Sequence, residues 1–142
     1  MKMKRLILSI FVLILFSCGR NESHPTQFIK NKDFITIPGI FYFKSIKVVV
    51  KEFNDGSLIY GVVDSKDHVI YQQSIVETFS NYSKWILYID DKDNIWFYTG
   101  DLQLTTVLLK VKDSKTDYVY KKIANDDIKI PSEMKEKMNT NH

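Results

Sequence analysis

Cysteine and histidine, which serve as nucleophile and base in many nucleophilic mechanisms, are few in this 142-residue chain. The chain has one cysteine, Cys18, and three histidines, of which only His68 falls within the strand-rich region. A catalytic nucleophile needs a base beside it, and that base needs a third group to orient it. His68 stands alone at a turn tip, so we expect an exposed loop histidine and no His-dependent hydrolase.

Carboxylates are the next residues that could do chemistry. Glu52 and Glu77 could form the pair of acids that hydrolyses a glycosidic bond, but sequence gives no distance between them. The Asp90–Asn94 run could contact Ca²⁺, although an EF-hand loop also needs a central glycine and a terminal glutamate. With five glycines the chain has no glycine-rich phosphate loop. We therefore predict no enzyme, metal or cofactor, and keep Asp64 and Asp101 as further acids for testing.

The surroundings of Cys18 are more informative than its thiol. Three basic residues lie within the first five positions, and residues 6–16 form an apolar run interrupted only by Ser9. This run is shorter than the about 20 residues of a spanning helix and is typical of a secretory signal peptide. The segment after residue 17 contains 17 basic and 17 acidic residues, so the charge gives no indication of nucleic-acid binding.

The tetrapeptide Leu15-Phe16-Ser17-Cys18 resembles the lipobox of bacterial lipoproteins, with an aliphatic residue three positions before the cysteine and a small residue directly before it. The resemblance covers only the leader. It implies that residues 1–17 are removed and that Cys18 carries a diacylglycerol thioether, often with an acyl chain such as palmitate on its new amino group. Two or three chains would hold the protein at a membrane, whereas one chain anchors only marginally. The alternative is an ordinary cleaved signal peptide with an incidental cysteine.

The residue after the cysteine bears on sorting. In Gram-negative bacteria an Asp at this position typically retains a lipoprotein at the inner membrane, and this chain has Gly19. The resemblance therefore implies the cell envelope, and the outer membrane in a Gram-negative cell, with the leaflet left open. The absence of a second cysteine agrees with an exported protein that uses no disulfides.

The chain after the leader is expected to hold one domain. We predict a polar tether over residues 18–32, a β domain over residues 33–130 and a C-terminal tail over residues 131–142. A segment of about 100 residues is long enough for one modest core and too short for two domains.

Aromatic residues make up 13% of the chain, and with many Val and Ile they favour strands. The apolar pattern changes phase within residues 41–53, which predicts a bulge or bend near Ser45. Asn54-Asp55-Gly56 predicts a hairpin turn. The expected strands are residues 34–37, 41–53, 58–63, 69–75, 85–89, 95–98, 104–111 and 118–123. These predict an all-β fold, an antiparallel meander of about seven or eight strands forming a small barrel or a sandwich, with a short helical segment over residues 132–138.

One pattern occurs twice, 26 residues apart. Residues 64–71 and 90–97 both read Asp-x-Lys-Asp-x-(Val/Ile)-x-aromatic, and residues 111–119 contain a weaker echo. An Asp that starts a turn can accept a hydrogen bond from its own backbone two residues on. The pattern therefore predicts repeated hairpins.

Aromatic side chains gather on the two strands around the second copy of this pattern. Strand alternation places Tyr88, Trp96 and Tyr98 on the face opposite the core, where they would form an exposed contact surface for protein or sugar. The alternative is that both faces are covered, for example by a packed C-terminal tail.

These features predict a small lipid-anchored envelope protein that acts as a non-catalytic binding module. Some bacterial immunity proteins and enzyme inhibitors are small lipoproteins of this plan, which is an analogy of size and address. Its expected partners are the membrane, through Cys18, and an unidentified protein. The alternatives are an accessory structural subunit of an envelope assembly and a carboxylate-dependent enzyme on cell-wall sugars.

Overall fold

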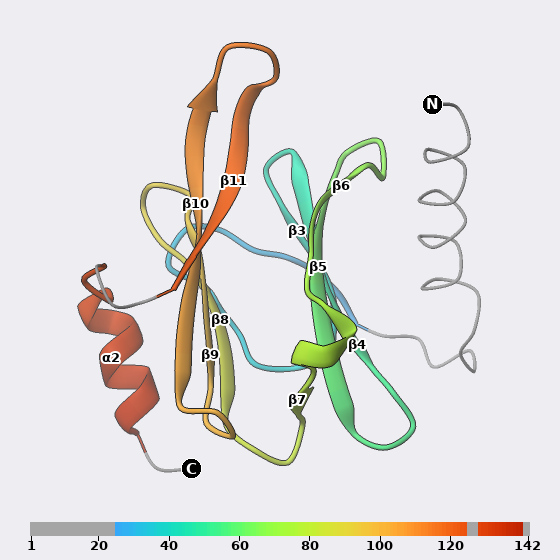
Figure 1. Cartoon of the computed structure of the whole chain (residues 1–142), viewed down its shortest axis with the longest axis vertical. Coiled ribbons are helices and arrows are strands. Elements are labelled where there is room, and N and C mark those ends of the chain that lie inside the picture. The colour runs from blue at the N-terminus through green and yellow to red at the C-terminus, as the bar shows by residue number, and fades with distance from the viewer. Residues whose placement is uncertain (1–24, 125–127, 141–142) are drawn as a thin grey trace.

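Two β-sheets pack face to face in the computed structural model, which describes residues 25–124 and 128–140 (Figure 1). Sheet A has the order β1-β3-β4-β5-β6, with β7 also paired to β5, and sheet B has the order β11-β10-β9-β8-β2. The strands of sheet A are β1 (Thr26–Phe28), β3 (Gly39–Phe43), β4 (Ile46–Glu52), β5 (Ser57–Asp64), β6 (Val69–Gln72) and β7 (Phe79–Ser80). Those of sheet B are β2 (Phe34–Ile35), β8 (Trp85–Ile89), β9 (Ile95–Thr99), β10 (Leu104–Asp113) and β11 (Asp117–Ala124). The all-β prediction is confirmed, and of its two alternatives the fold is the sandwich.

The described residues form eleven strands, more than the seven or eight expected. Two of the additional strands, β1 and β7, have only three and two residues, and the third arises because the segment expected as one strand over residues 41–53 forms two strands. Segments this short cannot display the alternation of apolar and polar residues from which strands are predicted. They pair because longer strands beside them offer backbone partners.

The segment expected as one long strand over residues 41–53 is a hairpin. Strands β3 and β4 pair antiparallel, with Phe43 opposite Ile46, and the two-residue turn between them has Lys44 at a φ of 50°. Residues paired across such a turn face the same side of the sheet. The phase change near Ser45 therefore comes from a turn, and the expected bulge is wrong.

The hairpin predicted at Asn54-Asp55-Gly56 is present between β4 and β5. Gly56 has a φ of 79°, a conformation that glycine adopts without strain. The Asp55 carboxylate accepts hydrogen bonds from the N–H and the hydroxyl of Ser57, at 3.0 and 2.6 Å.

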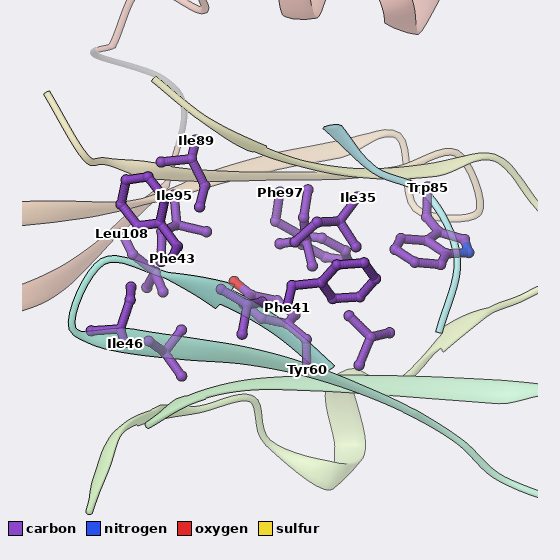
Figure 2. Close-up of a cluster of buried hydrophobic side chains, with 14 of the residues drawn as sticks. Ile35, Phe41, Phe43, Ile46, Tyr60, Trp85, Ile89, Ile95, Phe97 and Leu108 are labelled. Atoms are coloured by element: carbon purple, nitrogen blue, oxygen red, sulfur yellow. The ribbon is translucent and has the colours of Figure 1, made fainter. Parts of the chain in front are cut away.

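The main core lies between the two sheets and is built from the inward-facing residue of each alternating pair (Figure 2). Phe41, Tyr60 and Phe97 meet near its centre, where the ring centroids of Tyr60 and Phe97 are 5.0 Å apart. Phe79 packs on Phe97 at 4.7 Å. Strand β7 is therefore short in sequence but contributes a fully buried ring.

The predicted helical segment is α2 (Ser132–Asn139), which lies on the outer face of sheet B (Figure 1). Its fully buried Met134 completes a second apolar cluster with sheet residues. The Lys84 ammonium donates to the carbonyls of Met138 and Thr140, at 2.9 and 2.5 Å. A cation at a helix C-terminus is favourable because the last carbonyls carry partial negative charge.

The described part of the expected tether belongs to the folded domain. Strand β1 pairs in parallel with β3, and Ile29 packs against the main core. Asn31 donates to the carbonyl of Asp90 at 2.6 Å. Residues 25–32 were predicted to be a tether because they are mostly polar. An edge strand buries little side-chain surface, so it can be polar and still belong to the sheet.

Candidate functional site

A cleft of about 420 Å³ opens on the outer side of sheet B, between the turn that joins β8 to β9 and the chain that leads into α2. This volume lies in the range of ligand pockets. The lining residues are Tyr88, Asp90, Asp91, Lys92, Asn94, Trp96, Leu109, Ile128, Lys129, Pro131 and Glu133. Two segments about 35 residues apart in the sequence thus form its opposite walls.

The β8–β9 turn, residues 90–94, is organised around Asp90. One carboxylate oxygen accepts from the backbone N–H groups of Lys92 and Asn94, at 2.8 and 3.0 Å. The other oxygen accepts from the Asn94 side-chain amide and the Trp96 indole N–H, both at 2.9 Å. Four donors occupy this carboxylate, so its role is to hold the turn and orient Trp96.

The aromatic floor of the cleft is rigid. The Tyr88 ring packs against Phe34, with their centroids 4.7 Å apart. Burial raises the pKa of the Tyr88 hydroxyl, and the charge of Glu133 raises it further, so this hydroxyl keeps its proton at neutral pH. The floor is therefore aromatic and uncharged, although Tyr88 and Trp96 present only a small part of their surface to the cleft.

Charged side chains form the rim. The Lys32 ammonium lies 3.2 Å from the Asp91 carboxylate and 3.6 Å from that of Glu133. The hydrogen bond with Asp91 is the main cause that raises the pKa of Lys32. These side chains are about half exposed, and such pairs contribute little to stability. Their effect is to link the turn to the start of α2 across the mouth of the cleft.

Asp93, the fourth residue of this turn, fixes the turn to the rest of the domain through its side chain. Its carboxylate accepts from the Asn31 amide and from the Lys44 and Lys110 ammonium groups, at 2.9, 2.5 and 2.9 Å. Burial alone would raise the pKa of Asp93, but these three bonds outweigh it and lower the pKa to about 2. Lys44 lies in the turn between β3 and β4 of sheet A, and Lys110 lies in β10 of sheet B. The Asp93 carboxylate is therefore a clamp that ties the two sheets together beside the cleft.

The aromatic surface predicted from the sequence is not exposed as expected. Tyr88 and Trp96 are only 1% and 3% exposed, because Met134 of α2 and neighbouring apolar residues pack over them. Tyr98 is half-buried beside the same cluster and does not line the cleft. The exposed-surface prediction is therefore wrong for Tyr88 and Trp96, and the alternative, a face covered by the C-terminal tail, describes this part of the molecule.

The remaining candidate acids make separate structural contacts. Glu52 accepts from the Asn81 amide, Glu77 pairs with Lys122, and Asp101 accepts from the backbone N–H of Ser80. Asp64 lies 3.0 Å from the exposed His68 ring. Cys18 lies outside the described residues. Within the described ranges, no three His, Cys, Asp or Glu side chains form a group able to hold a metal ion.

Sequence reasoning missed the part of the cleft that comes from the C-terminal segment, and it missed the pairing of Lys32 with two residues that line the cleft. Local patterns identify turns and strand faces, whereas the meeting of Lys32 with Asp91 and Glu133 depends on three distant segments. The available signal was the four-residue spacing of Met134 and Met138, with Ile128 and Ile130 just before them, which marks a segment with an apolar side to cover.

The assembled site is suited to recognition by shape and charge. Asp90 is saturated with donors, Tyr88 is neutral, and Asp91 and Glu133 share a lysine. Among the described residues, no helix has the length and apolar character to cross a bilayer. Comparison with known proteins found no matching family model, curated protein or solved structure.

Proposed function

We propose that this protein is a lipid-anchored, non-catalytic binding module of the bacterial cell envelope. The observation that carries the proposal is the Leu15-Phe16-Ser17-Cys18 motif, which stands at the end of an apolar run of signal-peptide length that itself follows a basic start. A lipidated Cys18 would become the first residue of the mature chain. The cell envelope, and the outer membrane in a Gram-negative cell, is the corresponding location.

The anchor would keep the domain close to its membrane. Seven residues separate Cys18 from Thr26, the first residue of β1. Fully extended, the eight peptide steps between them span at most about 28 Å. This reach is about the diameter of a domain of this size. A module so placed would meet partners at the membrane surface.

The cleft beside the β8–β9 turn supports the binding part of the proposal. It combines a fixed aromatic floor with a rim of both charge signs, and Asp93 preorganises the turn that forms one wall. Such a surface favours a polar protein segment that can satisfy Lys92, Lys129 and the rim carboxylates. Preorganisation lowers the entropy that binding must overcome.

The anchor is tested by mass spectrometry of protein extracted from membranes of the producing cell. We expect a mature N-terminus at Cys18 carrying a diacylglycerol thioether. The Cys18→Ala variant should lose both the modification and the membrane fraction. An unmodified N-terminal cysteine in the wild-type protein would refute the lipid anchor.

The binding part is tested with a photo-crosslinking amino acid placed on the cleft rim. Lys92 is exposed and lines the cleft. Lys66 is a matched control, because it is also exposed and occupies the same position in the other copy of the Asp-x-Lys-Asp pattern, in the turn between β5 and β6. We expect a discrete protein adduct in intact cells from position 92 and none from position 66. Equal crosslinking from both positions would mean that the cleft has no special role.

A further inference from the structure

The outer face of sheet A carries many apolar residues although it points away from the core. Strand alternation and the pairing registers place fourteen strand residues on this face, and none of them is acidic. Seven are apolar or aromatic and two are lysines. The fourteen residues are Thr26, Phe28, Ile40, Tyr42, Lys47, Val49, Lys51, Ser57, Ile59, Gly61, Val63, Val69, Gln72 and Ser80.

Sandwich strands ordinarily alternate inward apolar residues with outward polar ones. Sheet B departs from this rule because α2 covers its outer face, which Figure 1 shows on the left of the molecule. Sheet A also departs from the rule, but among the described residues no α-helix lies over its outer face. Ile59 and Val63 in β5 are only 5% exposed, whereas Phe28 at the β1 edge is 86% exposed. An apolar sheet face of this kind is typical of a surface that meets something else.

The composition of this face fits a membrane surface. Phe28 is 86% exposed and stacks on Tyr42, with ring centroids 5.3 Å apart. The Lys47 ammonium lies over the Tyr42 ring at 5.8 Å and also pairs with Asp67 in the β5–β6 turn. Aromatic rings flanked by lysines are the side chains enriched where proteins contact lipid headgroups.

We propose that the outer face of sheet A rests on the surface of an anionic phospholipid bilayer. The inference builds on the lipid anchor proposed above, because β1, the strand closest in sequence to Cys18, is an edge strand of this sheet. The anchor thus enters the domain beside Phe28 and within about 28 Å of chain. Lys30, which is exposed just after β1, would supply a cation for lipid phosphates. Lys47 and Lys51 on the face would add to this charge, with a phosphate joining the contacts that they already make, such as the Lys47–Asp67 ion pair.

This orientation separates the two sides of the sandwich. With sheet A on the membrane, the second sheet lies about 10 Å farther out and α2 about 10 Å beyond that. The cleft on the outer side of sheet B would then open toward the aqueous compartment. One face would hold the domain to the lipid while the other stays accessible to a partner.

The orientation is tested with the lipidated full-length protein reconstituted in vesicles of anionic phospholipid. Lipidation consumes the only native thiol, so a cysteine introduced elsewhere is the single site for a fluorescent label. The labelled variants are Thr26→Cys near the anchor, Gln72→Cys at the far edge of the face, and Lys135→Cys on α2. Quenching by spin-labelled lipids should be about threefold or more stronger at position 72 than at position 135, given a separation of roughly 20 Å.

Position 72 distinguishes docking from mere tethering, because β6 lies at the opposite edge of sheet A from β1. The double variant Phe28→Ser, Lys51→Glu should reduce the quenching at position 72 and leave the protein in the membrane fraction. The control Tyr82→Ser removes an equally exposed aromatic that lies in the turn after β7, and should change nothing.

The outcomes separate this inference from the proposed anchor. Protein that never enters the membrane fraction would remove the anchor and the inference together. Anchored protein with equal quenching at positions 72 and 135 would overturn only the docking of sheet A. Weak quenching at position 72 combined with crosslinks between two copies at that position would assign the face to a dimer instead.

Discussion

The β5–β6 turn (residues 64–68) and the β8–β9 turn share one sequence pattern and one backbone conformation. In each, the carboxylate of the first Asp accepts from the N–H groups two and four positions later, at 2.8 to 3.0 Å. In each, the fourth residue is an Asp with positive φ, 63° for Asp67 and 64° for Asp93. The pattern therefore specifies the turn wherever it occurs.

The two turns differ in what surrounds them. The Asp67 side chain is 65% exposed and its ion pair is with Lys47, whereas the Asp93 side chain is 13% exposed and binds three donors. The second carboxylate oxygen of Asp64 lies beside the exposed His68 ring. The second carboxylate oxygen of Asp90 accepts hydrogen bonds from two buried side chains, those of Asn94 and Trp96. The comparison teaches that local sequence sets turn geometry, while packing sets what each side chain contributes to stability.

The largest expected difference comes from removing the first Asp of each turn. Asp90→Ala should lower the free energy of unfolding by about 3 kcal/mol, because it strands the buried donors of Asn94 and Trp96. Asp64→Ala should cause a distinctly smaller loss, because water can replace the exposed His68 contact. Urea unfolding of both variants measures the difference. Equal losses would mean that the turn backbone alone carries the effect.

The second comparison removes the charge of the fourth Asp. Asp93→Asn should cost about 2 kcal/mol at neutral pH, because the pKa of Asp93 is about 2 instead of 3.8 and each unit corresponds to about 1.4 kcal/mol. Asp67→Asn should cost less than about 0.5 kcal/mol, as is usual for exposed ion pairs. Asn tolerates positive φ, so the backbone is unchanged in both variants. In a Lys110→Met background the cost of Asp93→Asn should fall, and an unchanged cost would exclude coupling between the two residues.

The same residue predicts a pH dependence. The pKa of Asp93 is lower in the folded state than in the unfolded chain, so its stabilisation is complete above about pH 5 and is lost as the pH falls through 3.8 toward 2. The stability gap between wild type and Asp93→Asn should therefore close over this range. Denaturant unfolding at several acidic pH values measures it, with the other carboxylates cancelling in the difference. A gap that persists to pH 2 would contradict the assigned pKa.

The smallest effect is one that the two turns should share. A residue with positive φ is more favourable as Gly than as Ala by about 1 kcal/mol. The Gly variant should therefore exceed the Ala variant in stability by this amount at position 67 and equally at position 93. Thermal unfolding of the four variants checks it, and unequal differences would show that the two backbones differ in strain.

The turns and the strand-rich character of the chain were predictable because both depend on short-range interactions. Asp55 and Gly56 make their contacts within a few residues, as do Asp64 and Asp90. The hairpin at Lys44 was missed because Lys44-Ser45 is not one of the glycine-containing pairs, such as Asn-Gly or Asp-Gly, that mark a two-residue hairpin turn. Its only trace was the phase change of the apolar pattern, which a bulge explains equally well.

The candidate site was predictable only in part. The pattern brought Tyr88 and Trp96 to one face of neighbouring strands, and both do line the cleft. Whether a strand face is exposed depends on what packs over it, and Met134 lies 38 residues after Trp96. A local sequence pattern cannot predict a contact between residues so far apart in the sequence.

The sequence by itself determined the turns, the strand alternation and the apolar spacing of the C-terminal helix, because hydrogen bonds within five residues and side-chain periodicity act locally. Tertiary structure alone decided which sheet each strand joins, that α2 covers sheet B, and that Asp93 becomes a buried clamp while Asp67 stays at the surface. The physical reason is that burial and ion pairing depend on distant segments meeting. Two turns with the same sequence pattern can therefore have the same backbone geometry and contribute different amounts to the free energy of unfolding.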